Sequence, residues 1–172
     1  MKKTVLTFGV LSGLASAGMM AATVPFIERI GFDRGVYFGY TAIVISFLFV
    51  YFGVRSYRDN VLGGRITFGR AFQAGILITL ISCAFYVTMW LIVYYNFMPD
   101  FGDKYAAYLV ESVRADGGSQ ADIDDMMKRG EEAKQMLRNP FINAAVTFTE
   151  PFPVGLIMTL ISSAMLKKQE KN

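Results

Sequence analysis

The chain has 172 residues, of which 53% are hydrophobic and only 18% are charged, and its mean hydropathy is +0.38. Soluble domains usually carry about 25% charged residues, so the composition favours a membrane protein. The sequence contains one cysteine and no histidine. An intramolecular disulfide is therefore excluded, and the commonest general base and metal ligand is missing.

The charged residues avoid four long stretches of the chain. Residues 4–27, 35–54 and 71–99 carry no charge, and residues 139–166 carry only Glu150. A helix needs about 20 apolar residues to cross ~30 Å of hydrocarbon, and all four stretches are long enough. The sequence therefore predicts an all-α membrane protein, a single membrane domain over residues 1–172. Its transmembrane helices are expected at about 5–26, 35–54, 68–98 and 141–166.

The basic residues predict how these helices are oriented. The N-terminal segment has a net charge of +2, the connection between the second and third helices +3, and the C-terminal tail +2. The connection over residues 100–138 has a net charge of −3. Because Lys and Arg near membrane ends stay on the cytoplasmic side, both termini are expected in the cytoplasm.

The first apolar stretch admits a second interpretation. Lys2 and Lys3, an apolar run and then Ala15-Ser16-Ala17 resemble a signal peptide with its cleavage site. The apolar run continues to Phe26, which is long for a signal peptide and suits a transmembrane helix. The sequence leaves cleavage open, and the other three helices keep their orientation either way.

Residues 100–138 are polar and rich in helix-forming residues. Gly117-Gly118 divides them into two helical segments, and Ser119 followed by Asp122 resembles a capping box. We expect an extracytoplasmic helical hairpin between the third and fourth helices. The acidic residues of its second arm lack the spacing and glycine of a calcium-binding loop.

Small residues recur at every fourth position in several predicted helices, which places them on one helix face. Such faces let helix backbones approach closely in lipid. They are either packing surfaces within one bundle, the favoured interpretation, or dimerisation faces. The predicted packing residues are Gly9, Gly13, Ala17, Gly75 and Gly155.

The segment from Tyr51 to Phe72 resembles the signature of a bacterial integral-membrane family catalogued as domain of unknown function 4199. The pieces Pro99-Asp100-Phe101, Asn139-Pro140-Phe141 and Glu150–Leu156 are similar to that family as well. The resemblance covers nearly the whole chain. It implies a four-helix protein of the bacterial inner membrane, and it implies no activity.

Glu150 is the candidate functional residue within the membrane. It lies nine residues after Phe141, about 13 Å along a helix axis. An ionisable side chain at this depth costs several kcal/mol and often marks a functional site. Two roles remain open: a proton- or cation-handling carboxylate, or a hydrogen-bonded side chain beside a turn created by Pro151 and Pro153.

Four arginines in or beside the connection between the second and third helices form the other candidate site: Arg55, Arg58, Arg65 and Arg70. They could contact anionic lipid headgroups or a partner protein. The alternative is that they only determine topology.

Taken together, these features predict a non-enzymatic structural or interaction protein, with the lipid bilayer as its surroundings and a homo-oligomer or an unidentified membrane protein as its partner. No catalytic residue, metal, cofactor or nucleic-acid partner is expected. The alternative is a subunit of an oligomeric transporter or channel that uses Glu150. Four helices rarely enclose a pathway alone, so this alternative requires several copies.

Overall fold

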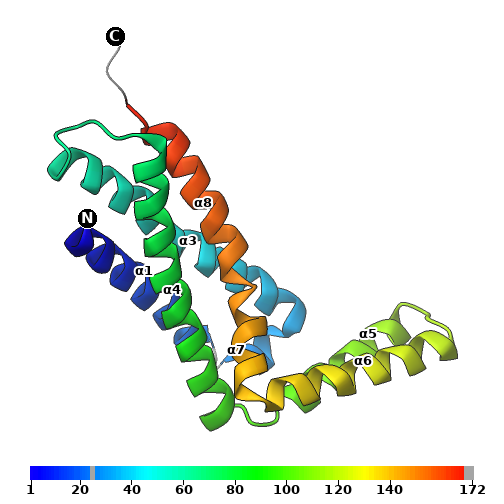
Figure 1. Cartoon of the computed structure of the whole chain (residues 1–172). Coiled ribbons are helices and arrows are strands. Elements are labelled where there is room, and N and C mark those ends of the chain that lie inside the picture. Colours follow the sequence, from blue (N-terminus) through cyan, green and yellow to red (C-terminus); the bar gives the residue numbers. More distant parts are fainter. Residues whose placement is uncertain (24–25, 169–172) are drawn as a thin grey trace.

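A computed structural model describes residues 1–23 and 26–168 of the chain (Figure 1). The prediction of an all-α membrane protein with four transmembrane helices is confirmed, because four helical spans are long and apolar enough to cross a membrane. The spans are α1 (Lys2–Thr23), α3 (Phe32–Asn60), α4 (Phe68–Asn96), and the pair α7 (Pro140–Phe148) and α8 (Pro151–Leu166). The remaining helices are α2 (Ile27–Ile30), α5 (Phe101–Ala115) and α6 (Gln120–Arg138).

The observed spans differ from the expected ones mainly at their ends. The helix expected over residues 35–54 begins at Phe32 and continues to Asn60, because the helix extends past its apolar segment into a polar turn that contains Arg55 and Arg58. The first span is described from Lys2 to Thr23, and the last part of the range expected for it, residues 24 and 25, lies outside the described residues. The fourth span is not one continuous helix but is interrupted before Pro151.

The α3–α4 pair forms the middle of the bundle. Both of these helices contact α1, and both contact α8. In Figure 1, α1 and α8 lie on opposite sides of this pair. The core therefore runs along α3 and α4, and the outer faces of all four spans carry exposed apolar side chains suited to lipid.

The predicted packing glycines face neighbouring helices within the bundle. A Cβ atom added to Gly9 would lie 2.8 Å from Cβ of Ile81, and one added to Gly75 would lie 2.8 Å from Cγ2 of Thr159. Ala17 is buried as well. Helix backbones therefore approach closely at these positions, as small residues in membrane bundles permit.

Small hydroxyl side chains pair with one another in the core. Ser12 of α1 donates to the carbonyl oxygen of Ser46 at 2.8 Å and lies 2.9 Å from the hydroxyl of Ser82. On the other side of α4, the hydroxyls of Thr79 and Thr159 are 3.0 Å apart. Because lipid offers no hydrogen-bond partners, such groups are stable only when they pair inside the protein. These bonds fix the register of α4 against α1 and α8.

Helices α5 and α6 form an antiparallel hairpin that extends sideways from one end of the bundle (Figure 1). The sequence feature at Ser119 is a capping box, since its side chain accepts from the Asp122 amide while the Asp122 carboxylate accepts from the Ser119 amide. The Ser119 hydroxyl also donates to the Asp122 carboxylate at 2.7 Å, and this bond, together with the one from the Ser119 amide, lowers the pKa of Asp122. Gly130 lets α6 approach Ala106 of α5 closely.

Aromatic side chains attach the hairpin to the bundle. The ring of Phe101 contacts Phe32 of α3 and Trp90 of α4, with centroid distances of 5.7 and 5.0 Å. Tyr108 of α5 donates a hydrogen bond to Asp33 of α3. Tyr95 of α4 donates to the carbonyl of Leu137 at 3.1 Å, near the end of α6. Both arms of the hairpin are thus bonded to the membrane helices.

Candidate functional site

The fourth span is interrupted between α7 and α8. The amides of Thr149 and Glu150 donate to the carbonyls of Val146 and Thr147, three residues back rather than four. Two prolines follow at 151 and 153, and neither has an amide hydrogen to donate. The chain keeps a helical backbone at Glu150, with φ of −76° and ψ of −59°. The interruption is therefore a tight turn that changes the direction of the helix without unwinding it.

Glu150 occupies this turn, deep in the span. It lies ten residues after Pro140, about 15 Å along the helix axis. Its side chain does not cap α8. Instead, its Oε2 atom accepts a hydrogen bond of 3.0 Å from the hydroxyl of Tyr86 on α4. Tyr86 is 9% exposed, whereas Glu150 is exposed on the surface of the bundle.

The Glu150–Tyr86 pair leaves part of a carboxyl group facing the membrane. Among the described residues, Glu150 has no ion-pair partner. A charged carboxylate facing hydrocarbon is costly. The group can avoid that cost by binding a proton, or by lying against a polar group of a second protein. The site can accept a hydrogen bond or exchange a proton.

A second polar network lies nearer the hairpin. Asn143 of α7 is fully buried. Its Oδ1 accepts from Nε1 of Trp90 at 2.9 Å and from the hydroxyl of Thr147 at 3.2 Å, and its Nδ2 donates to the carbonyl of Leu137 at 3.0 Å. One amide side chain thus links α4, α6 and α7. This network is a structural joint between the bundle and the hairpin.

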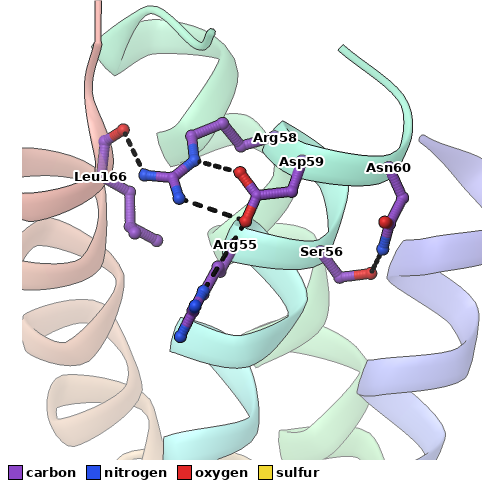
Figure 2. Close-up of polar contacts among 6 residues, drawn as sticks. All are labelled: Arg55, Ser56, Arg58, Asp59, Asn60 and Leu166. Carbon is purple, nitrogen blue, oxygen red and sulfur yellow. Dashed lines mark hydrogen bonds and ion pairs between the residues drawn. The ribbon is translucent and has the colours of Figure 1, made fainter. Parts of the chain in front are cut away.

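The arginines lie at the opposite end of the bundle and do not form one group. Figure 2 shows Arg58 between Asp59 and the end of α8. Its Nε donates to the Asp59 carboxylate at 2.6 Å, and its Nη1 donates to the carbonyl of Leu166 at 3.5 Å. Arg55 lies 3.6 Å from the same carboxylate. A cation at the carbonyl end of a helix is favourable, so Arg58 stabilises the end of α8.

The other two arginines are placed differently. Arg65 is exposed in the loop between α3 and α4, and the next residue, Ile66, pairs with Lys168 through two backbone hydrogen bonds of 3.2 and 2.9 Å. Arg70 is exposed in the first turn of α4. Of the C-terminal charges used to predict orientation, Glu170 and Lys171 lie outside the described residues.

Sequence reasoning found Glu150 but missed its partner and the buried amide. A tyrosine far from both ends of an apolar stretch was the available signal for Tyr86, since interfacial tyrosines lie near helix ends. Asn143 could have been noticed as an amide inside a predicted span. Within residues 1–23 and 26–168, the structure has no group of three or more side chains of the kinds that bind metal ions.

Comparison with known proteins adds one finding. Residues 7–168 match the family described as "Protein of unknown function (DUF4199)". No curated protein and no solved structure matches the chain. The match covers most of α1, all of the other three transmembrane spans and the hairpin, so the chain belongs to the DUF4199 family.

Proposed function

We propose that this protein is a non-enzymatic interaction protein of the bacterial inner membrane. Its two termini lie in the cytoplasm, and the hairpin α5–α6 lies at the outer face, where it contacts another membrane protein. The charge bias supports this orientation, because the segments next to the opposite end of the bundle are basic and the hairpin segment is acidic. The absence of histidine from the sequence supports a role without catalysis.

The attachment of the hairpin is the observation that carries this proposal. Aromatic contacts, the Tyr108–Asp33 hydrogen bond and the Asn143 network hold the base of the hairpin against the bundle. Helix α6 exposes two large apolar side chains, Met127 at 57% midway along the helix and Met136 at 50% near the base. A rigidly held helix pair with accessible methionines suits contact with a partner, because methionine adapts to irregular surfaces.

A second candidate function is favoured by the environment of Glu150. A carboxyl deep in a span, exposed to the membrane and bonded to Tyr86 alone among the described residues, suits proton or cation handling between subunits. In this alternative, several copies of the chain, or one copy with another membrane protein, surround the pathway and cover the carboxyl. The two candidate functions place the important residues at different sites.

The two candidate functions can be distinguished by testing which variants restore function to a deletion strain. Replacing Met127 and Met136 with glutamate should abolish complementation while changing the unfolding free energy by less than about 0.5 kcal/mol, because both side chains are exposed. Replacing exposed Ala121 and Gln135 with glutamate adds the same charge to α6 and serves as the control. We expect the control to complement.

In the same assay, Glu150→Gln tests the alternative, since the amide keeps the shape and can still accept from Tyr86. We expect this variant to fold and to complement. Loss of complementation by a stable Glu150→Gln protein, together with normal function of the methionine variant, would overturn the interaction proposal in favour of transport.

A further inference from the structure

An apolar groove of about 270 Å³ lies between α1 and α4, at the end of the bundle where α1 begins. Its walls are formed mainly by Val5 and Leu6 of α1 and by Leu77 and Ile81 of α4. Gly9 lets α1 contact Ile81 closely, so the two helices meet at the deep end of the groove. The groove therefore opens toward the surface of the membrane.

One basic side chain lines this groove, and a second lies on the same face of α4, nearer the start of that helix. Lys2 lines it directly. Arg70 is seven residues before Leu77 and 11 before Ile81, spacings that return to within about 20° on an α-helix. Arg70 is thus on the groove face of α4, about 10 Å nearer the membrane surface than Leu77. In Figure 1, α4 begins above the level at which α1 begins.

Within the described residues, no acidic side chain pairs with these two cations. Helices α1 and α4 contain neither aspartate nor glutamate. Within the described part of the chain, no side-chain hydrogen bond or ion pair of Lys2 or Arg70 is present. On α3, Asp59 is bonded to Arg58 and paired with Arg55. The groove therefore combines apolar walls with an uncompensated positive charge at its mouth.

We propose that this groove binds an anionic phospholipid, with one acyl chain between α1 and α4 and the headgroup phosphate held by Lys2 and Arg70. A phospholipid has both required parts in the correct order, an apolar chain in the hydrocarbon region and a negative group at the surface. A transmembrane helix of a partner would fill the apolar groove but would not require the two cations. Such a site makes the protein prefer anionic phospholipids over uncharged ones. Contact between apolar side chains and acyl chains alone would not produce this preference.

Lipid exchange on the purified full-length protein tests the proposal. The protein is placed in nanodiscs that contain phosphatidylglycerol and phosphatidylcholine in equal amounts, and bound lipids are measured by native mass spectrometry. We expect one retained phosphatidylglycerol per chain. Because each basic residue near a membrane surface contributes about fivefold to affinity, Lys2→Gln with Arg70→Gln should lower the preference about 25-fold.

The control removes the same charge from the same end of the bundle. Lys3 lies about 100° from Lys2 around α1, and Arg55 is exposed on α3 and paired with Asp59, so neither lines the groove. Lys3→Gln with Arg55→Gln should change the preference less than twofold. An equal decrease in both double variants would overturn the proposal, because it would show general surface attraction.

A groove-filling variant tests the apolar half of the site and leaves the charges in place. Leu77→Trp should prevent retention of the lipid, and thermal unfolding in detergent should show that the bundle remains folded. Full retention by this variant would contradict the placement of the acyl chain. If Leu77→Trp instead dissociates a dimer seen in the wild-type spectrum, the occupant is a second copy and the proposal is wrong.

Discussion

Gly155→Ala is expected to lower the unfolding free energy by about 1–3 kcal/mol, the usual cost of forcing extra volume into a packed core. Gly155 lies where α8 meets both central helices. An added Cβ atom would overlap Cγ2 of Thr79 on α4 and would lie 2.7 Å from Cζ of Phe47 on α3. Both neighbours are buried, at 0% and 2% exposure, so neither can move away freely. Denaturant titration in detergent micelles measures the change.

Gly39→Ala is the matched control for this variant. Gly39 is also helical, but an added Cβ atom there would have no neighbour within 4 Å. Alanine has a higher helix propensity than glycine, by up to about 1 kcal/mol, so Gly39→Ala should be neutral or stabilising. Equal unfolding free energies for the Gly155 and Gly39 variants would contradict the three-helix contact.

Asn143→Leu is expected to destabilise the protein by about 1–3 kcal/mol and to loosen the hairpin. The substitution removes the acceptor for Trp90 and one donor to Leu137, and a buried polar group without a partner costs about 1–3 kcal/mol. Trp90 is the only tryptophan in the chain, so its fluorescence reports on this network directly. We expect a shifted emission maximum and a lower midpoint of unfolding.

Asn96→Leu provides the comparison, because Asn96 is exposed and its side chain donates to the carbonyl of Ile92 in its own helix, at 2.8 Å. It should leave both the emission maximum and the midpoint nearly unchanged. If Asn143→Leu behaved in the same way, the joint between the bundle and the hairpin would not depend on this amide.

The transmembrane spans could be predicted from the sequence because their physical requirement is local. A span needs about 20 apolar residues, and charges mark its ends, so counting along the chain is sufficient. The hairpin was predictable for a similar reason, since Gly117-Gly118 and the Ser119 capping box are local turn and helix-start signals. The exact ends of the helices do not follow from apolar length alone, because a helix such as α3 can continue past its apolar segment.

The candidate sites depend on partners distant in the sequence, and these could not be predicted. Glu150 was recognised as a charge in an apolar stretch, but its partner, Tyr86, lies 64 positions away on another helix. The four arginines share one stretch of sequence, yet they separate in the structure. Arg58 bonds to Asp59 and to the end of α8, whereas Arg70 lies on the groove face of α4. Composition describes how many charges a segment has and does not describe which of them are already paired.

The direct test of the proposed orientation is the accessibility of single cysteines in intact cells. Cys83 is buried and is replaced by alanine to give a background without thiols. Ala121→Cys then places an exposed thiol near the tip of the hairpin, and Val61→Cys places one in the loop that follows α3. With the outer membrane permeabilised, a membrane-impermeant maleimide should label Ala121→Cys and should label Val61→Cys only after the inner membrane is opened. Labelling of Val61→Cys but not of Ala121→Cys in unopened cells would place the hairpin in the cytoplasm and contradict the account.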